Sequence, residues 1–363
     1  MLLTLCGDIS VIEKNQPLWD CNDLEQLFSD VLDLFKASDR VIVNLECALT
    51  DREYRIRKFG PNLKGKPFVA GLLKRAGVTD CGLSNNHVLD FGIGGLRDTM
   101  ALLDEAGLNH TGVGENEEDS RRDLVIELEG RTIRVITICE HEYTYALPGR
   151  LGARPYDPYD TAHDIRLAKS QADYVIVMYH GGKEHCRYPS PRLRKLCRAM
   201  VEDGADLVLC QHSHCIGCAE EYMGGNILYG QGNFHFVYPG EREDSWNEGL
   251  AVQVTIDDSM KVEYIPVVMD KDTGTLSLAK GERKEQMLAD FAARGEELKD
   301  GRWLDGWHQF CLSMKENYDK AVAGFHTGTE HDTQLFAHYL DCEAHTDVWR
   351  ELNQTWHRTL EIE

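Results

Sequence analysis

Short apolar runs alternate with helical hydrophobic patterns from the start of the chain to about residue 270. The apolar runs have the length of buried strands. They predict strands at 1–6, 40–43, 124–128, 133–138, 174–179, 205–210, 227–229, 251–256 and 262–269. Apolar residues at helical spacing predict helices at 24–35, 72–76, 96–106 and 191–202. This alternation predicts an α/β layered domain.

The pattern changes near Asp270. Beyond it, helical spacing dominates the segments 286–298, 307–322 and 332–345, and no strand-rich segment follows. We therefore expect an α/β domain over residues 1–270 and a helical C-terminal extension over residues 271–363.

Polar clusters follow six of the apolar runs. The clusters are Gly7-Asp8, Asn44-Leu45-Glu46, Asn85-Asn86-His87, His180-Gly181-Gly182, His212-Ser213-His214 and Gly232-Asn233-Phe234. Most of them carry an Asp, Glu, Asn or His that can ligate a metal. A sheet that delivers such residues from several strand ends can build a polynuclear metal centre, so the pattern favours a metal-dependent hydrolase.

The candidate ligands comprise two carboxylates, one amide oxygen and three imidazoles, from Asp8, Glu46, Asn86, His180, His212 and His214. This inventory suits two divalent ions, with Mn, Fe or Zn favoured, better than a structural zinc site closed by Cys and His. Alternation along an extended segment would place His212 and His214 on one side. Ser10 stands where a second early ligand is expected, which predicts that the first ion is held less fully.

His87 follows an Asn pair that is typical of a turn. Such a turn can aim His87 at a leaving group, where it would act as a general acid or stabilise charge. The alternative is a hydrogen-bonded histidine at a helix start.

Two further candidates leave alternatives open. His141, between two glutamates, lines the cleft or lies in a solvated loop. Cys215 and Cys218 are either incidental thiols or a zinc or redox pair.

The net charge is −22, which excludes nonspecific binding to nucleic acid and to anionic membranes. A small anionic or polymeric substrate stays compatible, because local cations and bound metals dominate a site. The stretch 51–66 is basic, and its Arg57 and Lys58 either hold an anionic substrate or belong to a solvated loop. No apolar run approaches the roughly 20 residues of a membrane span, and the twelve cysteines lack a disulfide-scaffold spacing. We expect a cytoplasmic protein without leader or membrane anchor.

The ordered clusters, together with Asp90-Phe91-Gly92, His180-Gly181-Gly182-Lys183-Glu184, Gly204-Ala205-Asp206 and Tyr229-Gly230-Gln231-Gly232-Asn233-Phe234, carry a family resemblance. Over about residues 1–270, the chain resembles the bacterial capsule-synthesis CapA (poly-γ-glutamate biosynthesis) family of calcineurin-like metallophosphoesterases. The resemblance implies a four-layer α/β sandwich, in which two mixed sheets are flanked by helices. Family members usually have Gly-His-His-Pro-His where this chain has Cys210-Gln211-His212-Ser213-His214.

The resemblance also implies a role for each site residue. Glu46 is implied to bridge two ions; Asp8 and His214 would complete one, and Asn86, His180 and His212 the other. His87 is implied to be the acid on the substrate side. Glu184 would be a further ligand or would support the ligands, and Asn233 would shape the site.

We therefore expect a metal-dependent hydrolase, in the first place a phosphoesterase related to capsule and poly-γ-glutamate synthesis proteins. Hydrolysis of an amide in γ-glutamyl compounds uses the same activated water and stays open. A non-catalytic polymer-handling or assembly protein is the alternative from another class.

Overall fold

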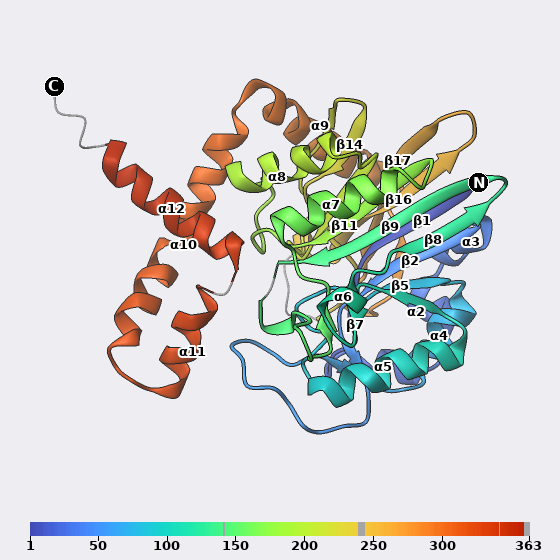
Figure 1. The fold of residues 1–363 in the computed structure, drawn as a ribbon, viewed down its shortest axis with the longest axis horizontal. Coiled ribbons are helices and arrows are strands. Elements are labelled where there is room, and N and C mark those ends of the chain that lie inside the picture. The colour runs from blue at the N-terminus through green and yellow to red at the C-terminus, as the bar shows by residue number, and fades with distance from the viewer. Residues whose placement is uncertain (141, 239–243, 341, 359–363) are drawn as a thin grey trace.

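Two mixed β-sheets face each other, and helices cover their outer faces (Figure 1). The computed structural model describes residues 1–140, 142–238, 244–340 and 342–358. The predicted four-layer α/β sandwich is confirmed, and helices follow it at the C-terminal end of the chain.

The first sheet contains mostly parallel strands at its centre and antiparallel strands on one side. Its order is β18 (Leu276–Leu278), β17 (Met260–Met269), β16 (Glu248–Ile256), β1 (Leu2–Ile9), β2 (Arg40–Leu45), β5 (Asp80–Gly82) and β6 (Asn109–Thr111), and β15 (Asn233–His235) also pairs with β1. The strands β1, β2, β5 and β6 run parallel to one another, so their carboxyl ends meet at one edge.

The second sheet has four parallel strands flanked by two antiparallel ones. Its order is β13 (Ala219–Tyr222), β14 (Gly225–Leu228), β12 (Leu207–Gln211), β11 (Tyr174–His180), β9 (Arg131–Cys139) and β8 (Leu124–Leu128). Two small pairs lie outside the main sheets: β3 (Ala48–Leu49) with β4 (Lys64–Gly65), and β7 (Val113–Gly114) with β10 (Gly152–Ala153).

The helices divide between the two sheets and the C-terminal region. In the first part of the chain they are α1 (Gln16–Asp20), α2 (Leu24–Phe28), α3 (Val31–Ala37), α4 (Val69–Ala76), α5 (Gly92–Ala106), α6 (Glu117–Ser120), α7 (Pro158–Lys169) and α8 (Pro191–Glu202). Those of the C-terminal region are α9 (Gly281–Asp300), α10 (Trp303–Phe325), α11 (Glu330–His338) and α12 (Glu343–Arg358). Short 3-10 turns span Glu142–Thr144 and Asp244–Asn247.

Side-chain alternation along the strands builds three apolar layers. On β11, Ile176 and Met178 join the core between the sheets, whereas Val175 and Val177 join the core beneath α7 and α8. A third core lies between the first sheet and the helices α2 to α5. A central strand buried on both faces reads as a continuous apolar run, which is why these strands were visible in the sequence.

Most of the predicted elements are present, and local chemistry explains their bounds. The predicted helix 191–202 coincides with α8, where the Ser190 side chain accepts a hydrogen bond from the backbone N–H of Leu193 and Pro191 occupies the first turn. The predicted strands 124–128 and 133–138 form the hairpin of β8 and β9, joined through Glu129 and Gly130 with φ of +53° and +75°.

Two predicted helical segments are wrong, because each is divided in the structure. Within 332–345, α11 ends at His338 and α12 begins at Glu343. The segment 24–35 forms two helices, α2 and α3, because Ser29 between them has φ of +40° and turns the chain. The apolar spacing continues through the break, since both helices pack on the same core. Periodicity therefore does not reveal the interruption.

The first of the C-terminal helices is packed into the sandwich. Met287 and Phe291 of α9 belong to the core between the two sheets, and the Phe291 ring packs edge-on against Tyr264 of β17 with centroids 5.0 Å apart. The helices α10 to α12 have a separate apolar cluster around Trp307 and Tyr318. The division of the chain into domains at residue 270 stays a prediction.

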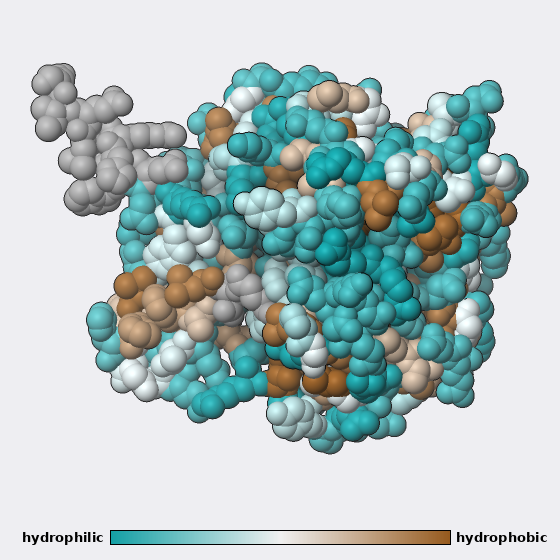
Figure 2. All heavy atoms as spheres, in the orientation of Figure 1, coloured by the Kyte–Doolittle hydropathy of each residue, from teal (hydrophilic) through white to brown (hydrophobic). Residues whose placement is uncertain are grey.

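The face shown in Figure 2 is mostly hydrophilic and has an apolar area over the C-terminal helices. None of the helices within the described residues combines the length and apolar character that a membrane crossing needs.

Replacing Phe291 by Ala should lower the free energy of unfolding by about 3 kcal/mol, because it empties a ring-sized volume between the sheets. Denaturant unfolding of the full chain measures this loss. Phe325, at the end of α10, is half exposed, and Phe325→Ala should cost less than about 1 kcal/mol. Equal costs for both variants would show that α9 does not contribute to the core of the sandwich.

Candidate metal centre

Parallel strands of both sheets end at one place and present polar side chains there. Asp8 lies near the end of β1, and Glu46 follows directly after β2. From the second sheet, His180 is the last residue of β11, and His212 follows directly after β12. All four side chains are buried.

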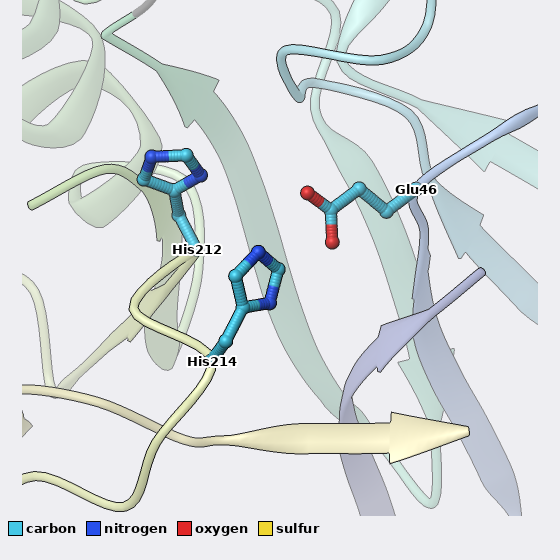
Figure 3. Close-up of side chains that lie close together, drawn as sticks. All are labelled: Glu46, His212 and His214. Carbon is cyan, nitrogen blue, oxygen red and sulfur yellow. The ribbon is translucent and has the colours of Figure 1, made fainter. Parts of the chain in front are cut away.

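Two groups of candidate ligands share Glu46. One group comprises Asp8, Glu46 and His180, and the other comprises Glu46, His212 and His214; within each group the ligand atoms lie within 4.8 Å of one another. Figure 3 shows the Glu46 carboxylate pointing across the gap toward the two imidazoles, which come from the opposite side.

The distances between ligand atoms suit a common ion. His180 Nε2 lies 2.8 Å from Asn86 Oδ1 and 3.4 Å from Glu46 Oε1. His214 Nδ1 lies 3.6 Å from Asp8 Oδ2, but it faces the Asn233 amide oxygen at 2.9 Å, so Nε2 is the His214 nitrogen that is left for an ion. Ligands bound to one ion at about 2.1 Å lie roughly 3 Å apart. The structure thus brings all six predicted ligands together, and the assignment of each ligand to one of two ions stays a prediction.

The Glu46 carboxylate provides the test of whether a divalent cation fits. Both of its oxygens are buried, and neither receives a hydrogen bond from the described residues. Burial raises the pKa of Glu46 well above its ordinary value, and the nearby charge of Asp8 raises it further. Two adjacent buried carboxylates are unfavourable in an apolar interior unless a cation compensates them, so the donor set fits divalent ions.

Asp8 is held by neighbouring groups from both sheets. Its Oδ1 accepts a hydrogen bond from Asn44 Nδ2 at 2.7 Å, and its Oδ2 accepts one from the backbone N–H of His212 at 3.2 Å. Burial nevertheless raises the pKa of Asp8 to about 6, because these hydrogen bonds only partly compensate the loss of water.

The two histidines after β12 reach the site through a turn. The prediction of an extended segment is wrong, because His212 has φ of +79° and His214 has φ of +53°. The left-handed backbone directs both rings to the same side, with centroids 5.9 Å apart. Such conformations cost about 1–3 kcal/mol each and are typical of functional sites. A hydrogen bond from the backbone N–H of His185 to the Ser213 carbonyl, at 2.8 Å, supports this turn.

His87 lies on the predicted turn and belongs to a buried charged triad. Its Nδ1 is 2.6 Å from Asp90 Oδ2, and Lys58 Nζ is 2.6 Å from Asp90 Oδ1. Burial lowers the pKa of His87, and the charge of Lys58 lowers it further, so the imidazole is neutral at pH 7 in the free protein. Burial would raise the pKa of Asp90, but Lys58 and His87 lower it below its ordinary value.

The two basic residues proposed for substrate binding lie in different environments. Lys58 is buried beside His87, whereas the Arg57 side chain is 72% exposed and pairs with Glu330 of α11. The loop that carries both residues thus connects the site with the C-terminal helices. Substrate binding by either side chain stays a prediction.

Asn233 and Ser10 occupy supporting positions. Asn233 Oδ1 lies 2.9 Å from His214 Nδ1, and its amide donates to the Trp246 carbonyl at 2.9 Å, so Asn233 orients the imidazole. The Ser10 hydroxyl donates to the Glu46 carbonyl at 2.9 Å and thereby supports the backbone of that ligand.

Glu184 lies in the loop after β11. Burial would raise the pKa of its carboxyl, but the charge of Lys183, followed by those of His214 and His185, lowers it strongly. The charge of Glu184 in turn raises the pKa of Glu46 and opposes the lowering of the pKa of His87 and His214. Whether Glu184 binds an ion or supports the ligands stays open.

Several supporting residues were missed in the sequence. Glu140 follows directly after β9; its Oε1 accepts a hydrogen bond from the backbone N–H of Gly182 at 2.7 Å and its Oε2 accepts one from Arg192 at 3.1 Å. The rule that polar residues follow strand ends would have found it. Trp246 packs against His214 with ring centroids 4.5 Å apart and the ring planes tilted by 38°, and no sequence pattern indicated this contact.

Of the other sequence candidates, His141 lies outside the described residues. Cys215 and Cys218 are buried free thiols, and burial raises the pKa of Cys215 to about 11. Neither belongs to a group of candidate metal ligands among the described residues.

Comparison with known protein families shows to which family the chain belongs. Residues 2–238 match the family model described as "Bacterial capsule synthesis protein PGA_cap". The chain belongs to this family. The matched range contains all six candidate ligands and His87.

Two curated relatives carry names that refer to capsule or PGA biosynthesis. "Capsule biosynthesis protein CapA" of Bacillus anthracis is 30% identical over 247 residues, which cover 65% of this chain and 60% of that protein. "PGA biosynthesis protein CapA" of Bacillus subtilis is 30% identical over 234 residues, which cover 63% of this chain and 62% of that protein. The chain therefore spans about three fifths of the length of these relatives.

Solved structures show a more distant likeness. A phosphatase from Mycoplasma pneumoniae is 16% identical, with 74% of this chain and 93% of that chain covered and a TM-score of 0.47. A 5'-nucleotidase precursor from Thermus thermophilus is 14% identical, with 81% of this chain and 58% of that chain covered and a TM-score of 0.44. Likeness at this level says nothing about the substrate.

Glu46→Gln should leave the metal-free protein at least as stable as the wild type at pH 8. The raised pKa of Glu46 means that its charge destabilises the fold increasingly as the pH rises above the ordinary carboxyl range, and Gln removes that charge. Added Mn²⁺ should raise the melting temperature of the wild type but not that of the variant. Thermal unfolding with and without Mn²⁺ measures both effects, and the exposed Glu221→Gln variant should behave as the wild type. A variant that retains the Mn²⁺ stabilisation would remove Glu46 from the ligand set.

Metal affinity should fall as the pH falls through about 6, because a proton competes with the ion for Asp8. A single competing proton with this pKa weakens binding about tenfold between pH 7 and pH 5. Calorimetric titration with Mn²⁺ at both values measures the change. An affinity independent of pH over this range would contradict a role for Asp8 as a ligand.

Proposed function

We propose that this protein is a metal-dependent hydrolase that acts on an anionic substrate, in the first place a phosphoester. The observation that carries the proposal is the buried Glu46 carboxylate, which has no hydrogen-bond donor among the described residues and is shared by two ligand groups beside His87. Membership in the capsule synthesis family supports a role related to capsule or poly-γ-glutamate synthesis.

The ligand set would be filled by two divalent ions, with Mn, Fe or Zn favoured by its mixed nitrogen and oxygen donors. Ions bound there supply a water of lowered pKa and positive charge for the oxygens of the electrophile. Asp8, Glu46, His180, His212 and His214 would hold them. Asn44 and Asn233 orient two of these ligands, Asp8 and His214, through the hydrogen bonds described above.

His87 would assist the leaving group. Asp90 fixes its ring through Nδ1, and Lys58 fixes Asp90 in turn. In the free protein the pKa of His87 is lowered, so the ring is neutral at pH 7. A negatively charged substrate beside the ring favours the imidazolium, which supplies the proton that a departing oxygen needs.

Amide hydrolysis in γ-glutamyl compounds is the second candidate reaction. The name of the Bacillus subtilis relative, which refers to PGA biosynthesis, favours it.

We further propose that the protein works in the cytoplasm. All twelve of its cysteines are free thiols, which supports a reducing compartment.

The proposal is tested by metal analysis and hydrolysis assays on one preparation. Mn²⁺-loaded protein should contain two ions per chain and hydrolyse an aryl phosphate, a γ-glutamyl anilide or both, and chelation should abolish the activity. His87→Ala should lower kcat about 100-fold or more with unchanged metal content. His214→Ala should lose metal as well as activity, whereas His163→Ala on the exposed face of α7 should change neither.

Two results would contradict the proposal. Metal-loaded protein that is inert toward both substrates would indicate a non-catalytic polymer-handling or assembly protein. Protein that takes up no divalent ion would exclude the metal centre.

A further inference from the structure

Lys183 is a buried cation that has no hydrogen-bonded partner within the described part of the chain. Its residue is 8% exposed, and it lies in the loop that follows His180 at the end of β11. Among the described residues, its nearest carboxylate oxygen is Glu184 Oε2, which is 3.8 Å from the Lys183 ammonium and thus beyond hydrogen-bond distance. Lysine is almost never buried unless it is paired, because a desolvated ammonium needs acceptors. The ion pair with Glu184 contains no hydrogen bond, so the three N–H donors of the ammonium can bind a ligand.

The loop that carries Lys183 is held by hydrogen bonds and lies beside the candidate ligands. The Gly182 N–H donates to Glu140 at 2.7 Å, and the His185 N–H donates to the carbonyl of Ser213, between the two ligand histidines, at 2.8 Å. Cys186 belongs to the apolar cluster of the C-terminal helices. The loop that carries Lys183 is thus held between the candidate ligands and these helices.

The charges of Glu184, Lys183 and Lys58 all act on His338 of α11. His338 of α11 stacks on Phe59, the neighbour of Lys58, with ring centroids 4.9 Å apart. Burial lowers the pKa of His338 to about 4; the charge of Glu184 opposes this shift, and those of Lys183 and Lys58 add to it. The Lys58 ammonium lies 2.6 Å from Asp90, within hydrogen-bond distance, whereas the Lys183 ammonium lies 3.8 Å from Glu184, so Lys183 is the less tightly held of the two cations.

We propose that Lys183 binds a second anionic group of the substrate, a carboxylate or phosphate remote from the bond that is cleaved. This inference rests on the proposed function, and it narrows the substrate to molecules that carry at least two anionic groups. The geometry thus makes Lys183 a specificity residue rather than part of the metal centre.

Binding measurements test the inference without requiring turnover. We would titrate Mn²⁺-loaded protein with orthophosphate, pyrophosphate and γ-glutamylglutamate by calorimetry, using the wild type, Lys183→Met, Lys183→Arg and the exposed control Lys195→Met. Lys183→Met should weaken one or both of the extended probes about ten- to a hundredfold and orthophosphate less than about threefold. Lys183→Arg should retain most of the affinity, and Lys195→Met all of it. Whichever extended probe is weakened identifies the second group as phosphate or carboxylate.

Three results would overturn the inference. One is a Lys183→Met variant that binds every probe as the wild type does. Another is a variant with a lowered melting temperature but unchanged binding, which would make Lys183 a structural residue. The third is a wild type that binds neither extended probe more tightly than orthophosphate. Because none of these measurements depends on hydrolysis, the proposed function can fail or hold independently of them.

Discussion

The burial of two adjacent carboxylates is the constraint on which the rest of this structure depends. Asp8 and Glu46 come from neighbouring parallel strands and are removed from water together, which raises the pKa of both. An apolar fold tolerates such a pair only when donors or cations compensate it. The amide of Asn44 and the backbone of His212 supply part of this compensation for Asp8, whereas none of the described residues donates a hydrogen bond to the Glu46 carboxylate. The fold thus retains an electrostatic cost at the point where metal binding would offset it.

The two sheets supply different candidate ligands to the site. The first sheet supplies the carboxylates, and the second supplies His180 and the turn with His212 and His214. The site forms only where the sheets are held in register by the apolar core between them, to which α9 contributes Phe291. The C-terminal helices also reach the site through charge, because Asp347 of α12 accepts from Arg192, which donates to Glu140 beneath the Gly182 loop.

Sequence patterns predicted the structure correctly where a feature depends on residues that are close together in the chain. Central strands buried on both faces are continuous apolar runs, and polar residues that follow parallel strands share one edge, so the six ligand candidates could be predicted before any coordinates. Patterns failed where the backbone leaves regular geometry. Ser29 divides a predicted helix and His212 adopts a left-handed conformation. Both have a positive φ, which cannot be predicted from a serine or a histidine in the sequence.

The sequence by itself determined the layered α/β fold, the family and the set of candidate ligands, because each depends on periodicity or on residues close to a strand end. Tertiary structure decided how these residues act. Only packing brings Lys58 and Asp90 against His87. Only packing buries Glu46 and Lys183 in places where, among the residues described, neither makes a hydrogen bond through its charged group. These relations join segments that are distant in the chain, and their energies depend on the exclusion of water, which no local pattern encodes.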